Sequence, residues 1–331
     1  MHCELVVPGL FAGASEARAP ALELLLARGR AATTESRALE AWLQHGFGLE
    51  PRSVAAGALT LLAAQLDPGS AWWVRADPVH LRLARDRLIV VPEAAFALSR
   101  EEADALVASL NHHFEGVLDL RAVDTRHWCA RLQEDLALDV PNALECAGRD
   151  VDLTARIGGE TGRRWSRLLN EVQMLLHAHP VNQAREARGE PAVNSLWLWG
   201  AGRAPQDAKG RWQSVSAADP LPLGLAKVAR VQPFALPASA EEWLARAPAE
   251  GRHLIVLDLL RAPLALGQDA EYRERIDVLE QRWFAPLMAA LRTGRAGMLT
   301  VHVPDAAASF ETARGDLRRF WRRRRALERY A

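Results

Sequence analysis

The segment from Thr161 to Gly202 reads TGRRWSRLLNEVQMLLHAHPVNQAREARGEPAVNSLWLWGAG, and the rest of the chain is organised around it. Its first half repeats apolar residues at spacings of three and four, which predicts an amphipathic α-helix. A polar segment interrupted by Pro180 follows, then the short apolar run 195–199 and a glycine turn at 200–202. Helix, polar loop, buried strand and glycine turn form the arrangement in which α/β proteins present side chains to a ligand.

On both sides of this stretch, short apolar runs alternate with segments of helical periodicity, which predicts a mainly parallel sheet flanked by helices. Short strands cluster in the middle of the chain, which predicts an inserted smaller α/β lobe. We therefore assign residues 1–70 and 191–331 to an α/β core and residues 71–190 to an inserted ligand-binding lobe. The expected strands are 4–7, 72–83, 88–91, 253–260 and 298–303, and the expected helices are 20–28, 35–45, 53–66, 99–112 and 269–292.

Composition excludes several classes of protein. The 331 residues are 49% hydrophobic, and 41 Lys and Arg balance 41 Asp and Glu, so no overall charge favours binding to nucleic acid or a membrane. No run approaches the roughly 20 apolar residues that a bilayer requires, so we expect a cytoplasmic protein. The three cysteines lack CxxC spacing, which argues against a disulfide framework and a thiolate zinc site.

Two sequence blocks carry a resemblance to a known family. Residues 179–202 follow the order HPVNxxRxxxGxPxxNSLWLWGxG, and residues 73–81 read WVRADPVHL. The first block resembles the archaeal-type cofactor-independent phosphoglycerate mutases. Both blocks are more similar still to bacterial regulatory proteins of the RpfE type, divergent relatives of those mutases. The resemblance implies an alkaline phosphatase-like core that is split by an inserted lobe.

The resemblance also implies a test for catalysis, because those mutases place a nucleophilic hydroxyl beside two divalent cations held by Asp and His ligands. Here Pro8 occupies the position of the ligating aspartate that ends the first strand, and the segment 257–269 lacks the expected histidines. Asp305 is retained without its neighbouring histidine. We therefore predict no metal centre, no cofactor and no catalytic residues.

The nucleophile lacks a clear match as well. Thr33, Thr34 and Ser36 lie near the position where it would fall, but Thr34 or Ser36 equally suits the N-cap of the following helix, and we favour that role. The alternative hypothesis is a working metal-dependent phosphoglycerate mutase or phosphatase whose site is rearranged around Asp258, Asp269 and Asp305.

Polar residues of the two family blocks are the candidate ligand-binding site. Arginine offers a planar fork that suits a carboxylate or phosphate, and asparagine fixes orientation through paired donors and acceptors. A structural interpretation stays open for each: Asp77 pairs with Arg75 or Arg87, the histidine fills a gap, and the asparagines hold turns. The candidates are Arg75, Asp77, His80, Asn182, Arg185 and Asn194.

The C-terminal segment 314–329 contains eight arginines, six of them between residues 318 and 325 around Phe320 and Trp321. Its spacing predicts a docked amphipathic helix whose arginines pair with acidic neighbours, and a contact with nucleic acid is the interpretation we do not favour.

Together these observations predict a non-catalytic regulatory or ligand-sensing protein, a pseudoenzyme on a phosphoglycerate mutase-like fold. Its expected partners are a small anionic or phosphorylated metabolite and, in a regulatory role, another protein. We do not expect nucleic acid or a membrane to be a partner.

Overall fold

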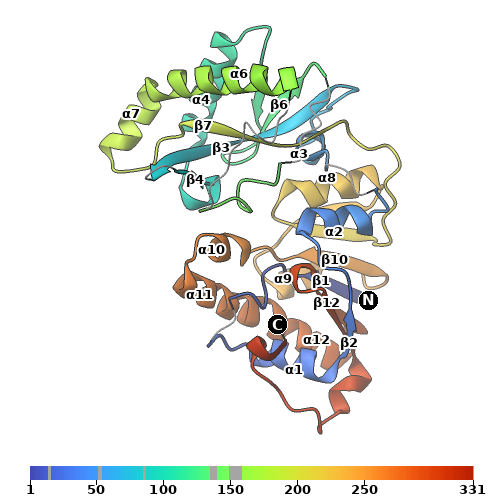
Figure 1. Ribbon diagram of the computed structural model, residues 1–331. Helices are drawn as coiled ribbons and strands as arrows, with labels where there is room; N and C mark the ends of the chain where they lie inside the picture. Colours follow the sequence, from blue (N-terminus) through green and yellow to red (C-terminus); the bar gives the residue numbers. More distant parts are fainter. Residues whose placement is uncertain (14–15, 51–53, 85–86, 135–139, 149–158, 331) are drawn as a thin grey trace. The chain divides into compact units, whose positions relative to one another are not determined.

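The computed structural model describes residues 1–13, 16–50, 54–84, 87–134, 140–148 and 159–330, which form two compact units (Figure 1). Unit 1 comprises Met1–Pro51 and Asp207–Ala331, and unit 2 comprises Arg52–Gln206. In the sequence, unit 2 therefore lies between the two segments of unit 1. The boundaries differ from the predicted ones at 70/71 and 190/191, because a helix and a strand outside 71–190 pack and pair with the long strand of unit 2.

Unit 1 is built on a seven-stranded sheet in the order β2-β12-β11-β1-β10-β8-β9. Four of its six pairings are parallel, and only β12 and β2 at one edge run antiparallel to their neighbours. This confirms the predicted fold class, a mainly parallel sheet flanked by helices. The strands are β1 (His2–Val6), β2 (Arg30–Thr33), β8 (Ser214–Ala217), β9 (Gln232–Ala235), β10 (Arg252–Val256), β11 (Met298–Val303) and β12 (Ala308–Ala313).

Helices cover both faces of this sheet because successive side chains of a strand point to opposite faces. Leu299 and Val301 of β11 belong to the buried core that the helices α1, α9, α11 and α12 share. His302, one residue further along the same strand, faces the ring of Trp42 in α2, with ring centroids 5.1 Å apart. The helices are α1 (Pro20–Arg28), α2 (Leu39–Gly46), α8 (Pro220–Val228), α9 (Ala240–Arg246), α10 (Arg261–Ala265), α11 (Asp269–Leu279) and α12 (Ala285–Thr293).

The predicted long helix at 269–292 forms as a continuous helical stretch with one irregularity. A π-helical turn, Glu280–Phe284, joins α11 to α12 and precedes Pro286, which lies in the first turn of α12. Since proline has no backbone N–H, it is tolerated best at the start of a helix. Gly294 ends α12 in the left-handed conformation, with φ +85°.

Unit 2 is organised around one long strand, β3 (Trp72–Ala84), which pairs antiparallel with three others. Helix α3 packs against β3 so closely that a Cβ at Gly57 would lie 2.6 Å from the Val74 carbonyl carbon. The other strands are β4 (Arg87–Val91), β5 (Asp119–Ala122), β6 (Trp128–Leu132) and β7 (Ser195–Gly202). The helices are α3 (Ala56–Ala63), α4 (Arg100–His113), α6 (Gly159–His177) and α7 (Pro180–Ala187).

Two local predictions were wrong. The polar segment after α6 is helix α7 rather than a loop, because Pro180 occupies the first helical position and the His179 ring caps it by accepting from the Val181 amide. The C-terminal segment contains only short 3₁₀ turns, Arg314–Arg318 and Leu327–Tyr330, among its described residues. Of the predicted apolar stripe, Leu327 is buried and Leu317 packs against the core, whereas Phe320 and Trp321 are 78% and 66% exposed, so no continuous buried face stabilises a helix.

None of the described helices combines the length and the hydropathy that a membrane span needs.

Candidate functional site

The loops that follow β1 and β11 meet at the carboxyl-terminal ends of the parallel strands of unit 1, which we call the carboxyl edge of the sheet. The resemblance places the metal centre of the mutases at this edge. After β1 the chain turns at Gly9, whose φ of +79° is favourable only for glycine. The Gly9 amide donates to Asp305 Oδ1 over 3.0 Å, and the Gly9 carbonyl accepts from the Tyr272 hydroxyl over 2.9 Å. Asp305, the retained aspartate, therefore has a structural partner in the loop that follows β1.

The residues at this edge do not fit a two-cation centre. Pro8 offers no ligating group, and one oxygen of Asp305 is already used by the Gly9 amide. Across the described ranges, no three His, Cys, Asp or Glu side chains gather in a way that could hold a metal ion. Asp258, Asp269 and Asp305, the ligand set of the alternative hypothesis, are all described and do not form such a group.

The segment between β2 and α2, where the nucleophile was sought, forms hydrogen bonds with the backbone of the loop after β11. Ser36 Oγ donates to the Asp305 carbonyl over 3.0 Å, and the Thr34 amide donates to the Ala307 carbonyl over 2.7 Å. The N-cap of α2 is Ala38, so the expected capping role of Thr34 or Ser36 was wrong. These contacts join the segment before α2 to the loop after β11.

A buried carboxylate of unit 1, Glu4, was not among the predicted site residues. Glu4 of β1 accepts from Arg211 over 2.8 Å and from Trp212 Nε1 over 3.0 Å, with His302 Nε2 at 3.4 Å. Burial alone would raise its pKa, but these donors and the charge of Arg211 outweigh burial and lower the pKa of Glu4 to about 2. The carboxylate is thus held charged inside the sheet, where it has a structural role.

In unit 2, Arg75 and Asp77 form a buried ion pair along one face of β3. Arg75 Nη2 lies 2.7 Å from Asp77 Oδ1, and Asp77 Oδ2 accepts from Trp199 Nε1 over 2.6 Å. Arg75 also donates to Thr60 Oγ1 over 3.3 Å. Both members of the pair are buried, and both have partners within unit 2, as the structural interpretation of these residues proposed.

Next to this pair lies a carboxylate that the sequence analysis missed. Burial raises the pKa of Glu93 to about 7, and the negative charge of Asp77 adds to the effect. Glu93 Oε2 is buried and has no hydrogen-bond partner among the described residues. Its neighbours at 92–96 carry no recognisable motif, so only the folded arrangement reveals it.

The other four predicted site residues brace one short connection, residues 190–194 between α7 and β7. The His80 ring lies 2.8 Å from the Ala192 carbonyl oxygen, and Asn194 exchanges two hydrogen bonds with the backbone of Leu81. Asn182 donates to the Val193 carbonyl and accepts from the Val193 amide, over 2.7 and 2.9 Å.

Arg185 is only 1% exposed and completes this connection. It donates to the Pro191 carbonyl over 2.9 Å and to Glu102 over 2.8 Å, while its Nη2 has no partner in the described part of the chain. Glu102 also closes the capping box of Ser99 at the start of α4, as the sequence predicted. The two family blocks thus supply structural contacts, and a ligand role for their six residues stays a prediction.

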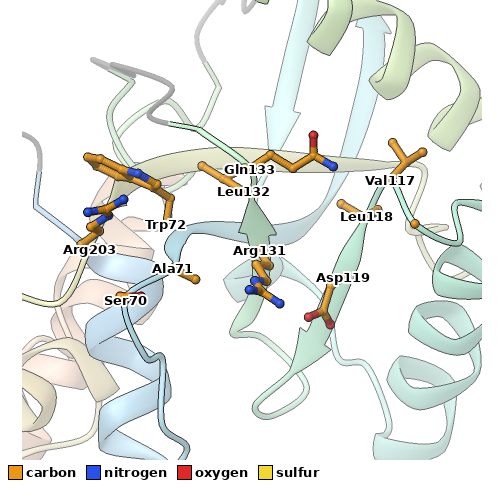
Figure 2. A pocket seen from close by; sticks show the side chains of 11 residues that line it. Ser70, Ala71, Trp72, Val117, Leu118, Asp119, Arg131, Leu132, Gln133 and Arg203 are labelled. Atoms are coloured by element: carbon orange, nitrogen blue, oxygen red, sulfur yellow. The ribbon is translucent and has the colours of Figure 1, made fainter.

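Figure 2 shows a pocket of unit 2 with a volume of about 500 Å³, within the range of small-molecule sites. The Arg203 guanidinium lies over the Trp72 ring, 4.7 Å from its centroid, at one side of the pocket. Arg131 and Asp119 face each other in the register of β6 and β5. None of the six predicted site residues lines this pocket, whose charges are mixed.

The fold and these contacts define an α/β protein with an inserted, largely antiparallel unit. No known family profile matches the chain. It is 26% identical over 204 residues to the 2,3-bisphosphoglycerate-independent phosphoglycerate mutase of Methanosarcina mazei, covering 57% of this chain and 50% of that protein. It is 29% identical over 171 residues to the probable enzyme of that name from Geobacter sulfurreducens, covering 49% of this chain and 42% of the relative.

Among solved structures, the PH0037 protein from Pyrococcus horikoshii has the same fold, with a TM-score of 0.57 at 14% identity over 94% of this chain and 87% of that one. The chain spans about half the length of the curated relatives it matches. It is a distant homologue of the cofactor-independent phosphoglycerate mutases and has a phosphoglycerate mutase-like α/β fold, which confirms that part of the predicted resemblance.

Proposed function

We propose that this protein is a cytoplasmic, non-catalytic regulatory protein of the RpfE type, which senses a small anionic or phosphorylated metabolite on a phosphoglycerate mutase-like fold. The observation that carries the proposal is the hydrogen bond from the Gly9 amide to Asp305 Oδ1. It ties the aspartate that the mutases would use as a ligand to the backbone beside Pro8.

Two divalent cations a few ångströms apart need several carboxylate and imidazole ligands with lone pairs directed at the metals. At this edge the surroundings of Gly9 are apolar instead: a Cβ there would meet Leu264 at 3.1 Å and Leu260 at 3.8 Å. Apolar crowding and a backbone donor on Asp305 both disfavour a cation at this position. They support a fold that is kept after its metal centre is lost.

The ligand-sensing half of the proposal has separate support. Arginine forks suit phosphates and carboxylates, and arginine side chains line two hollows of the protein, one in each unit. Arg75 and Arg185 remain candidates, but their side chains already bond to Asp77 and Glu102.

The test is a phosphoglycerate interconversion assay in the presence of Mn²⁺, on the wild type and on the matched variants Asp305→Asn and Asp269→Asn. We expect no turnover by any of the three proteins. Turnover by the wild type that is lost in Asp305→Asn would contradict the proposal and favour the alternative of a rearranged metal enzyme.

A further inference from the structure

The C-terminal segment, α1 and β2 line a hollow of unit 1 that we call the arginine hollow, with a volume of about 750 Å³. In Figure 1 the red end of the chain returns beside the blue α1. The volume falls in the range of small-molecule sites. The lining residues are Leu26, Ala27, Gly29, Arg30, Ala31, Phe310, Trp321, Arg322, Arg323, Arg325 and Tyr330.

The returning chain is fastened at several points. Arg322 Nη1 donates to the Gly29 carbonyl over 2.7 Å, and Arg319 Nη1 donates to the Arg28 carbonyl over 3.1 Å. Leu327 is buried in the core of unit 1, and the Tyr330 ring packs edge-on against Phe310 with centroids 5.7 Å apart. The hollow is therefore formed by chain that the fold holds in place, and it is not a gap beside a loose end.

The charges of the arginine hollow have one sign. Four arginines and no acidic residue line it, unlike the pocket of unit 2, where Asp119 lies among the arginines. Arg30, Arg323 and Arg325 form no ion pair with any residue that the structure describes. Unpaired guanidinium groups that converge on a concave surface attract anions and favour phosphate, which they bind through paired hydrogen bonds.

An aromatic surface lies beside these charges. Trp321 lines the hollow with two-thirds of its surface exposed, and Phe320 packs edge-on against it with centroids 5.3 Å apart. An exposed indole is a favourable surface for stacking a planar ring.

We propose that the arginine hollow binds a nucleotide, with its phosphates on Arg323, Arg325 and Arg30 and its base against Trp321. This inference deepens the proposed function and rests on its ligand-sensing half alone, because it does not depend on the loss of catalysis. A small molecule suits the site better than a nucleic-acid strand, since the hollow has the volume of a small-molecule site and the chain as a whole has no net charge.

The experiment is titration calorimetry of the full chain with ATP in EDTA, and in parallel with inorganic tripolyphosphate. Arg323→Gln/Arg325→Gln is expected to weaken ATP binding by at least roughly tenfold, since each charge-assisted hydrogen bond is a strong contact. Trp321→Ala is expected to weaken ATP and leave tripolyphosphate unchanged. The matched control is Arg163→Gln/Arg164→Gln, which removes two exposed arginines from α6 in unit 2 and should change neither affinity.

Four results would overturn the inference: no saturable ATP binding by the wild type, full affinity in Arg323→Gln/Arg325→Gln, an equal loss in the α6 control, or much tighter binding of single-stranded oligothymidylate than of ATP. The interconversion assay on the same sample separates the two proposals. Turnover together with ATP binding would contradict the non-catalytic proposal and support the nucleotide site. A protein that neither turns over phosphoglycerate nor binds ATP would support the non-catalytic proposal and contradict the nucleotide site.

Discussion

The protein carries two contrasting sets of arginines. Arg75 and Arg185 stand in the sequence blocks that most resemble a known family, and both are buried and bonded to a carboxylate. Arg323 and Arg325 stand in a segment that matches no motif, and they are exposed around a hollow without an acidic partner among the described residues. The arginines of a distinctive sequence motif can thus stabilise the fold rather than bind a ligand.

The physical reason is the cost of burying charge. A guanidinium group taken out of water needs a carboxylate and further hydrogen bonds, so its neighbours are tightly specified. A guanidinium group at the surface stays hydrated, so it needs no particular residues as neighbours. The buried set should therefore control stability, and the exposed set should control binding.

Asp77→Ala should have the largest effect on stability, because it leaves Arg75 buried without its carboxylate and Trp199 Nε1 without its acceptor. We expect a loss of about 3–5 kcal/mol in the free energy of unfolding, measured by urea denaturation. The matched control Asp119→Ala breaks a half-exposed pair with Arg121 and should cost less than about 1 kcal/mol. Similar costs for the two variants would remove the distinction between buried and exposed pairs.

Asn182→Ala should come next. Its side chain makes three hydrogen bonds to the backbone of Leu176 and Val193. In the variant the Val193 amide and carbonyl lose these contacts, whereas the Leu176 carbonyl keeps the His179 amide as a donor. A loss of about 2–3 kcal/mol is expected in the same measurement, against less than about 0.5 kcal/mol for Ala at the exposed Gln183. A near-neutral Asn182→Ala would mean that this residue is kept for another purpose, and would return it to the list of ligand candidates.

Glu93→Gln should change how stability depends on pH. The folded-state pKa of Glu93 lies at about 7, above its ordinary value of 4.5, so the folded state holds this proton more tightly than the unfolded state does. The free energy of unfolding therefore falls as pH rises from the ordinary value to about 7, and glutamine, which stays neutral, avoids that loss. The variant should gain on the order of 2 kcal/mol over the wild type at pH 8 and little at pH 4. An equal difference in the free energy of unfolding between the variant and the wild type at the two pH values would contradict this.

Arg323→Gln/Arg325→Gln should have the smallest effect on stability, below about 0.5 kcal/mol, because exposed side chains without partners contribute little. The thermal midpoint of this variant should match that of the wild type in the absence of ligand. A clear loss would show that these arginines hold the C-terminal segment, and would weaken their assignment to a ligand.

Much of the fold could be predicted because the spacing of apolar residues and the capping residues follow from the local secondary structure. The long strand at 72–84, the capping box at Ser99 and the helical stretch ending at Gly294 all follow from local chemistry. The C-terminal segment shows the limit, since apolar spacing predicts a buried helical face that includes Phe320 and Trp321, and the core leaves both of them exposed. Whether a spaced apolar residue is buried depends on what packs against it, and a single sequence does not contain that information.

The candidate site was harder to predict for a related reason. Asn182 and Asn194 offer the same donors and acceptors to a ligand as to the backbone, and their sequence pattern is identical in either case. Glu93 and the arginine hollow were missed because their neighbours come from distant parts of the chain, α1 and the C-terminal segment in the case of the hollow. The absence of a metal centre stays a prediction, which rests on Pro8 at the position where the related mutases have an aspartate, because a proline side chain offers no ligand.

The most direct test of the account is Mn²⁺ titration calorimetry on protein stripped with EDTA, with elemental analysis of the untreated sample. We expect no stoichiometric metal in the untreated protein and no saturable Mn²⁺ binding, with the same trace for Asp305→Asn as for the wild type. Tight binding of one or two equivalents of Mn²⁺ that disappears in Asp305→Asn would contradict it, and would show that the edge of the unit 1 sheet still holds a metal centre.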